Sequence, residues 1–237
     1  GTILLTDKEN IFITDARYLE EVNNFLTIND EFIIYDNKDV AEEDNQTFFK
    51  DCENVGFEEN YVTYADYTNI VRKYRIRNIE ETENVIEKLR MVKDETELSY
   101  IEKACEITDK CFKHLLSYIK IGMTEKQVAF EIEKFFAQNG ADGVAFETIV
   151  ASGVNSSKPH AIPSDKIIRA GDPITIDFGA KYKGYCADMT RTIFAGEVSD
   201  ELQNLYNYIL KNQLRATKDI KEGISCKMIA RSVENDF

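Results

Sequence analysis

The 237-residue chain is 43% hydrophobic and 30% charged, enough apolar sequence to build one large domain or two smaller ones. Its net charge is −14 and no block of lysine and arginine occurs, which argues against nucleic acid or an anionic membrane surface as a partner. No apolar run reaches transmembrane length, and no signal-peptide pattern is present. The five cysteines show no CxxC spacing, so we expect reduced thiols in a cytoplasmic protein.

The first 77 residues alternate between strand and helix patterns. Strand patterns cover residues 3–5, 11–14, 32–35 and 55–57, and helix patterns cover 17–25 and the stretch from the capping residue Thr63 to about Lys73. Alternation of this kind predicts a small α/β layer domain. The chain opens at Gly1 inside a strand pattern and stops at Phe237 inside a helix pattern, which suggests either a fragment or only the ordered residues of a longer chain.

Residues 78–92 are rich in charge and predict a linker, after which residues 93–237 form a second domain. Two capping-box patterns open its first two helices, Asp94 with Glu97 and Thr124 with Gln127. The remaining patterns are a strand over 146–151, a loop over 152–172, a β-hairpin, a helix over 199–219 and a last helix capped by Ser225. We expect the helices over 97–119 and 124–138 to cover the sheet that contains the hairpin.

Two aspartates lie in the strands of this hairpin. The midpoint between Asp177 and Asp188 falls between Tyr182 and Lys183, which predicts that the aspartates are direct cross-strand neighbours with Cβ atoms roughly 5 Å apart. Carboxylates this close repel each other unless a proton or a cation lies between them. The same face carries Thr175, Thr190 and Thr192, and away from the turn it has no histidine or lysine. A divalent metal is therefore the favoured interpretation, and an exposed face with two incidental acids is the alternative.

His160 lies in a loop that Pro159 and Pro163 stiffen, which makes it a candidate functional residue, with an ordinary surface histidine as the alternative. The other histidine, His114, lies in the first long helix among apolar neighbours and is expected to pack or to be exposed rather than to bind a metal. Thr190 is expected to orient a carboxylate as a hydrogen-bond donor, and Arg191 to form a structural ion pair.

Several spaced motifs carry a family resemblance. Ile149-Val-Ala-Ser-Gly153, Pro159-His160-Ala-Ile-Pro163, Ile176-Asp177-Phe-Gly-Ala and Ala187-Asp188-Met-Thr-Arg-Thr resemble the Xaa-Pro aminopeptidase and prolidase branch of the creatinase-like, pita-bread metallopeptidases. Residues 89–97 resemble the segment that opens the catalytic domain of this family, and residues 14–18 resemble part of its N-terminal domain. The implied fold is an α/β N-terminal creatinase-like domain followed by the first half of an α+β pita-bread catalytic domain.

The resemblance implies a centre of two divalent metals, with Mn expected first and Co or Zn as alternatives, held by two Asp, one His and two Glu. Asp177 would bind one metal, Asp188 would bridge both, and His160 would contact the substrate rather than a metal. The implied reaction is hydrolysis of a small peptide with proline in second position, in which the metals polarise the carbonyl and activate water. A homodimer is also implied.

The resemblance places the His and Glu ligands of the family in a second half of the catalytic domain, beyond Phe237. It also implies that the N-terminal domain lacks its opening strand and helix. We therefore expect the 237 residues alone to be inactive, to lack the dinuclear centre and to bind at most one ion weakly. The expected function is that of an Xaa-Pro aminopeptidase. The alternatives are an Xaa-Pro dipeptidase (prolidase) and a non-catalytic pita-bread scaffold; retention of Asp177, Asp188 and His160 favours an enzyme.

Overall fold

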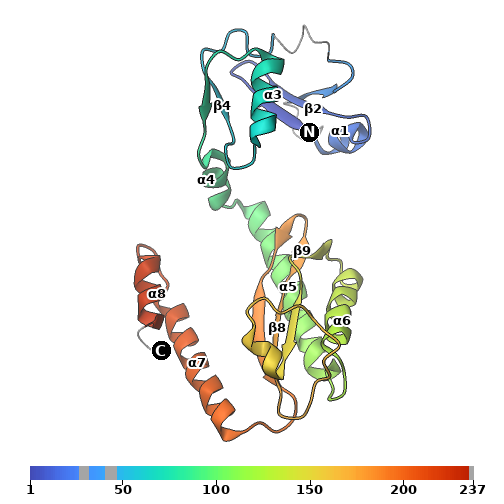
Figure 1. Cartoon of the computed structure of the whole chain (residues 1–237), viewed down its shortest axis with the longest axis vertical. Coiled ribbons are helices and arrows are strands. Elements are labelled where there is room, and N and C mark those ends of the chain that lie inside the picture. Colours follow the sequence, from blue (N-terminus) through green and yellow to red (C-terminus); the bar gives the residue numbers. More distant parts are fainter. Residues whose placement is uncertain (27–31, 41–46, 235–237) are drawn as a thin grey trace. The chain divides into compact units, whose positions relative to one another are not determined.

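The computed structural model describes residues 1–26, 32–40 and 47–234. The chain forms two compact units, Gly1–Val92 and Lys93–Phe237 (Figure 1). Among the described residues, no helix combines the length and the apolar character needed to cross a membrane.

The first unit contains two small sheets. Its strands are β1 (Thr2–Leu5), β2 (Asn10–Thr14), β3 (Phe32–Asp36), β4 (Val55–Phe57) and β5 (Ile79–Glu81). Strand β2 pairs with β1 antiparallel and with β3 parallel, and β4 pairs with β5 parallel. Its helices are α1 (Leu19–Leu26), α3 (Tyr64–Tyr74) and α4 (Val85–Met91). The buried centre consists of Leu4, Ile11, Ile13 and Tyr74.

Local signals set the boundaries of α3. The Thr63 hydroxyl accepts a hydrogen bond from the Asp66 amide at 3.2 Å, as the N-cap pattern predicts. Arg75 ends the helix in the left-handed conformation, with φ of 50°. The stretch 78–92, which the sequence predicts as a linker, contains β5 and α4. Strand β5 is only three residues long and depends on pairing with the distant β4, so its own sequence gives little signal.

The second unit opens with two helices, α5 (Glu95–Tyr118) and α6 (Glu125–Gln138). Both predicted capping boxes are confirmed. The Asp94 side chain accepts from the Glu97 amide while the Glu97 side chain accepts from the Asp94 amide, and Thr124 and Gln127 make the same reciprocal pair.

The strands of the second unit are β6 (Gly143–Val144), β7 (Ile149–Ser152), β8 (Pro173–Phe178), β9 (Ala180–Tyr182), β10 (Tyr185–Cys186) and β11 (Met189–Phe194). In its described residues, the second unit has two three-stranded sheets, β11-β8-β7 and β10-β9-β6, and the predicted hairpin contributes strands to both. Strand β8 lies between β11 and β7, and β9 lies between β10 and β6, with all pairs antiparallel. A 3-10 helix, η1 (Gly153–Ser157), follows β7.

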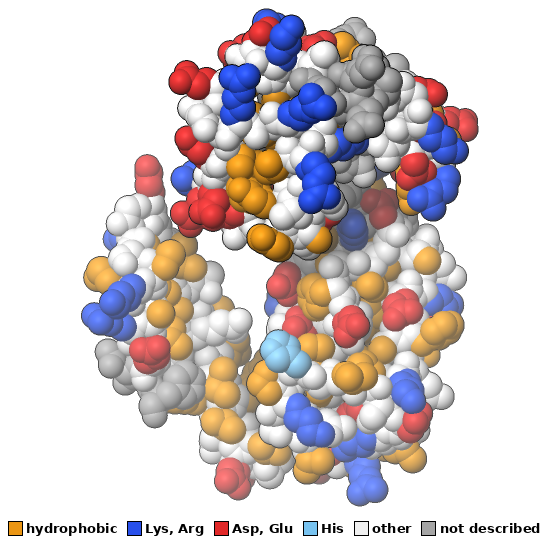
Figure 2. Space-filling view, turned by 45° about the horizontal axis from the view of Figure 1, so that its top comes forward, with side chains coloured by type: hydrophobic (Ala, Val, Ile, Leu, Met, Phe, Trp, Pro, Cys, Tyr) orange, Lys and Arg blue, Asp and Glu red, His pale blue; other side chains and the backbone are white. Residues whose placement is uncertain are grey.

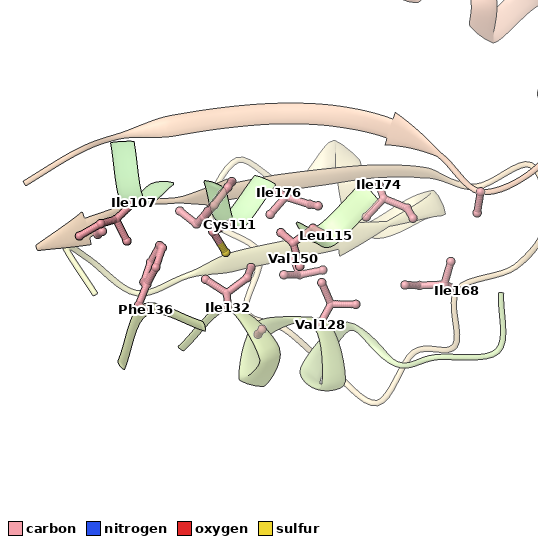
Figure 3. Packing of buried hydrophobic residues seen from close by; sticks show 14 residues of the cluster. Ile107, Cys111, Leu115, Val128, Ile132, Phe136, Val150, Ile168, Ile174 and Ile176 are labelled. Atoms are coloured by element: carbon pink, nitrogen blue, oxygen red, sulfur yellow. The ribbon is translucent and has the colours of Figure 1, made fainter. Parts of the chain in front are cut away.

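Helices α5 and α6 cover one face of the sheet that contains β8, as expected (Figure 1). Ile174, Ile176 and Phe178 of β8 are fully buried. All three belong to one buried cluster with residues of α5 and α6, and Figure 3 shows Ile174 and Ile176 among Ile107, Cys111, Leu115, Val128, Ile132 and Phe136. Because side chains alternate along a strand, Thr175 and Asp177 point to the opposite face. The core therefore fixes which face of β8 presents the aspartate.

Two further helices follow the sheet, α7 (Asp200–Asp219), capped by Ser199, and α8 (Cys226–Glu234). The Phe194 ring contacts the Tyr206 ring of α7, with centroids 5.6 Å apart. Hydrophobic side chains are exposed along α7 and α8 (Figure 2), and they include Leu205, Tyr208, Ile209, Leu214 and Met228.

Candidate active site

The hairpin that carries the two aspartates turns later than predicted. Lys183 and Gly184 adopt φ values of 50° and 84°, and the flanking residues Tyr182 and Tyr185 pair with each other. Two successive positive φ values suit a two-residue hairpin turn of the type I′ class, and glycine fits the second position well. The centre of the turn therefore lies one residue beyond the expected one.

This shift changes the register by two residues. Asp177 pairs with Thr190, so the prediction that Asp177 and Asp188 are direct cross-strand neighbours is wrong. If the same register is continued, Asp188 falls opposite Gly179, which makes the two aspartates diagonal neighbours. Such neighbours are roughly 7–8 Å apart in a regular sheet. Asp177 is half-buried, whereas Asp188, directly before β11, is exposed.

The backbone is closely packed between the two aspartates. The Ala187 amide donates to the Ala180 carbonyl at 2.9 Å, and the Ala180 amide donates to the Thr108 hydroxyl of α5 at 3.0 Å. A Cβ atom on Gly179 would lie 1.8 Å from the Ala187 oxygen. Glycine at 179 therefore allows the close approach of the Gly179 and Ala187 backbones. This approach places Asp188 directly before the start of β11.

Thr190 donates a hydrogen bond from its hydroxyl to Asp177 Oδ1 at 2.8 Å. The predicted contact between Thr190 and a carboxylate is thus present. The next pair along the same face, Thr175 and Thr192, is joined by a hydroxyl–hydroxyl hydrogen bond of 3.3 Å. Asp177 consequently lies on a polar face with Thr175, Thr190 and Thr192, and hydrogen bonds join these side chains in pairs.

His160 is exposed on the loop that follows β7 and η1. In the described part of the chain, no hydrogen bond joins His160 to Asp177 or Asp188. The structure therefore has both aspartates on one hairpin and His160 on a separate element of the same unit.

The donor set fits part of a metal centre. Two carboxylates on one hairpin offer the hard oxygen ligands that Mg²⁺, Mn²⁺ and Ca²⁺ prefer. Within residues 1–26, 32–40 and 47–234, however, no three His, Cys, Asp or Glu side chains gather closely enough to form a metal site. Asp177 and Asp188 can thus contribute to a centre, and further ligands are needed to complete its coordination.

The two remaining sequence expectations at this site have different outcomes. His114 packs as expected: its ring lies against Phe135 and Tyr118, and its Nε2 is 2.9 Å from Glu131 Oε1. Arg191 does not form the expected ion pair within the described residues. Its guanidinium lies 5.9 Å from the Phe112 ring centre. The prediction is wrong because Arg191 faces an aromatic side chain of α5 rather than an acid.

Sequence reasoning missed Glu125, the first residue of α6, which is fully buried. Its carboxylate accepts hydrogen bonds from the amide and hydroxyl of Ser152 at 2.7 and 2.9 Å, and from those of Ser164 at 3.1 and 2.6 Å. The Asn155 side-chain amide lies 3.1 and 3.2 Å from its two oxygens. Burial raises the pKa of Glu125, but the bonds from Ser164, Ser152 and Asn155 outweigh it and leave the pKa below its usual value.

A partly buried ion pair, Lys166 with Asp172, extends this network. Lys166 Nζ donates to Ser152 Oγ and to Asp172 Oδ2, both at 2.8 Å. Burial raises the pKa of Asp172, but the bonds from Lys166 and the Arg169 amide outweigh it and lower the pKa overall. An acidic residue in the first turn of a helix is common, so Glu125 gives no local signal of its own. The polar cluster of Ser152, Asn155 and Ser164 is the signal that could have indicated its partners.

Comparison with known proteins gives the family. Residues 99–237 match Metallopeptidase family M24, and residues 1–92 match the Creatinase/Prolidase N-terminal domain. The chain therefore belongs to metallopeptidase family M24. This confirms the resemblance and the fold inferred from the motifs, a creatinase-like N-terminal domain followed by part of a pita-bread domain.

Relatives of both exopeptidase types are similar to the chain. An Xaa-Pro dipeptidase from Bacillus anthracis superposes with a TM-score of 0.90 at 35% identity, over 100% of this chain and 67% of its own. An X-Pro aminopeptidase from Thermotoga maritima superposes with a TM-score of 0.86, also at 35% identity, over 99% of this chain and 66% of its own. The Xaa-Pro dipeptidase of Pyrococcus horikoshii is 40% identical over 138 residues, 57% of this chain and 39% of that protein. The chain thus matches well under half the length of that relative.

Proposed function

We propose that this chain belongs to a metal-dependent exopeptidase that removes the N-terminal residue from peptides with proline in second position. The observation that carries the proposal is the polar face of β8 and β11, where Thr190 pairs with Asp177 and donates a hydrogen bond to it, with Asp188 directly before β11 on the same hairpin. Membership of a metallopeptidase family and the similarity to the Thermotoga X-Pro aminopeptidase support it.

The roles proposed for the residues follow from the family resemblance. Asp177 would bind one divalent metal and Asp188 would bridge two, with Mn²⁺ preferred and Co²⁺ or Zn²⁺ as alternatives. The metals, when bound, would supply Lewis acidity for hydrolysis of the peptide bond. Thr190 would hold one oxygen of Asp177 in place, so that the carboxylate presents a fixed orientation. His160, exposed on its loop, would contact the substrate peptide.

A dipeptidase is the second candidate, because the Bacillus anthracis Xaa-Pro dipeptidase is as similar in sequence as the aminopeptidase. A non-catalytic scaffold fits less well, since such proteins tend to lose their metal-binding side chains, and both aspartates are present on one hairpin. We further propose a cytoplasmic homodimer, in which the exposed apolar side chains of α7 and α8 become covered.

We also propose that the 237 residues alone are inactive. The described residues offer two carboxylates at the hairpin and no cluster of three ligands, whereas a divalent ion in an oxygen site takes six or more ligands. One weakly bound ion is the expected result for this chain.

The test is hydrolysis of Xaa-Pro dipeptides and Xaa-Pro-Xaa tripeptides in the presence of Mn²⁺. It compares the 237-residue chain with the full product of the gene that encodes it. We expect the full product to cleave tripeptides, to lose activity on chelation of the metal, and to lose it in the Asp177→Asn and Asp188→Asn variants. Cleavage of dipeptides alone would favour the dipeptidase. A full product that binds metal but cleaves neither substrate would refute the proposed activity.

A further inference from the structure

The buried carboxylate of Glu125 joins the two ends of the loop that carries His160. Ser152 is the last residue of β7, Ser164 lies four residues after His160, and Asn155 lies between them. All three donate to Glu125, through both backbone amides and side chains. One carboxylate therefore closes the loop at both ends and also holds a point within it.

Backbone amides at the start of α6 also donate hydrogen bonds to carbonyl groups at the end of the same loop. The amide of Glu125 donates to the Lys166 carbonyl, and the amide of Lys126 donates to the Ser164 carbonyl, both at 3.2 Å. Thr124 forms a β-bridge with Ile167. The first amides of a helix have no partner within the helix, and here the loop supplies their acceptors. The start of α6 thus both accepts from the loop and donates to it.

The chemistry of this contact requires an ionised carboxylate. Every group that faces the Glu125 oxygens is a donor, and an ionised carboxylate has only acceptor sites to offer. A glutamine would present two N–H donors to some of these groups, and an aliphatic residue would leave all of them unsatisfied. Burying a charge is costly unless it is fully hydrogen-bonded, as it is here. The donors all belong to the loop and its flanks, so the carboxylate mainly stabilises the loop conformation.

Lys166 and Asp172 add further hydrogen bonds that hold the same loop. Lys166 connects Ser152, at the start of the loop, to Asp172, which directly precedes β8. Asp172 in turn accepts from the Arg169 amide at 2.9 Å. The side chains of Glu125, Ser152, Lys166 and Asp172 therefore form a continuous network from the first turn of α6 to the strand that carries Asp177.

We propose that Glu125 is a positioning residue, whose ionised carboxylate fixes the loop 152–164 and thereby holds His160 in place relative to the sheet that carries Asp177. The proposal rests on the proposed function in one respect, namely that His160 contacts the substrate. Glu125 itself is buried and would touch neither the metal nor the peptide.

The test uses the fact that the chain has only two histidines, His114 and His160. In histidine-labelled protein, the two ring Cε1–Hε1 signals report separately on the α5–α6 contact and on the loop. We expect the Glu125→Gln variant to shift the His160 signal toward its random-coil position and to lower the order parameters of residues 153–163, while the His114 signal stays unchanged.

The matched control is Glu131→Gln, also in α6, because Glu131 contacts His114. It should move the His114 signal and leave that of His160 in place. If Glu125→Gln does not fold, Ser164→Ala removes one donor to the carboxylate and should loosen the loop in the same direction. Unchanged His160 and loop signals in a folded Glu125→Gln or Ser164→Ala variant would overturn the proposal, as would equal changes at both histidines.

A second readout applies where peptidase activity is present. If Glu125 acts through His160, Glu125→Gln should lower kcat/KM at least tenfold in the wild-type background and have little further effect in a His160→Ala background. Additive losses in the double variant would overturn the positioning role. Absence of peptidase activity would refute the proposed function and leave the loop test by NMR intact.

Discussion

Replacing Gly179 with alanine is expected to destabilise the second unit by about 3 kcal/mol. The new Cβ would lie 1.8 Å from the Ala187 oxygen and 2.6 Å from the Ala187 carbonyl carbon, whereas real Cβ contacts essentially never fall below 3.0 Å. The two backbone segments would have to separate by about 1 Å. This stretches the hydrogen bonds from Ala187 to Ala180 and from Ala145 to Gly179, now 2.9 and 2.8 Å. Two weakened bonds at about 1 kcal/mol each and the overpacking itself account for the magnitude.

The assay is urea unfolding followed by far-UV circular dichroism, with Gly184→Ala as the matched control. Gly184 lies in the same hairpin with φ of 84°, and no atom lies within 4 Å of the position that a Cβ would occupy there. Alanine at 184 should therefore lower the free energy of unfolding only by the cost of the left-handed conformation, about 1 kcal/mol. Gly179→Ala should also weaken Mn²⁺ binding, because it displaces Asp188. A Gly179→Ala protein that is as stable as Gly184→Ala would refute the close packing at this position.

Three further predictions concern the core, the metal face and pH. Ile176→Ala should lower the free energy of unfolding by roughly 2–5 kcal/mol, because Ile176 is fully buried against α5 and α6, whereas Thr175→Ala on the opposite face should cost far less; urea unfolding checks both. Thr190→Val should weaken Mn²⁺ binding by about tenfold or more in a calorimetric titration, with only a small change in stability, because it frees Asp177 Oδ1. The pKa of Glu125 is lower in the folded protein, so its ionised form stabilises the fold above the pKa of an unfolded glutamate, about 4.3, and this contribution disappears as pH falls through the lowered pKa. The stability difference between wild type and Glu125→Gln should therefore be largest near pH 7 and shrink below about pH 4; a difference that does not change with pH would contradict this.

Elements with local signals were predictable from the sequence. The capping boxes at Asp94 and Thr124 involve side chains three residues apart, so the sequence contains both partners of each contact. The strand that carries Asp177 was also predictable, because its alternating burial requires apolar residues on one face only. These signals were enough to identify the helices that cover the sheet and the face on which Asp177 lies.

Features that depend on distant partners were not predictable in the same way. The register of the hairpin depends on whether the turn begins at Tyr182 or Lys183, and a difference of one residue decides which side chain faces Asp177. Strand β5 exists because β4, more than twenty residues earlier in the chain, offers it a partner. Glu125 finds its donors 27 and 39 residues along the chain, so only the folded loop reveals its contacts.

The assignment of Asp177 and Asp188 as metal ligands is tested most directly by Mn²⁺ titration of the 237-residue chain, followed by line broadening of the backbone amide signals. We expect one weakly bound ion, with broadening strongest near residues 177 and 188 on β8 and at the start of β11. The Asp177→Asn and Asp188→Asn variants should each abolish this pattern. Broadening that is absent, centred elsewhere, or unchanged in both variants would contradict the assignment.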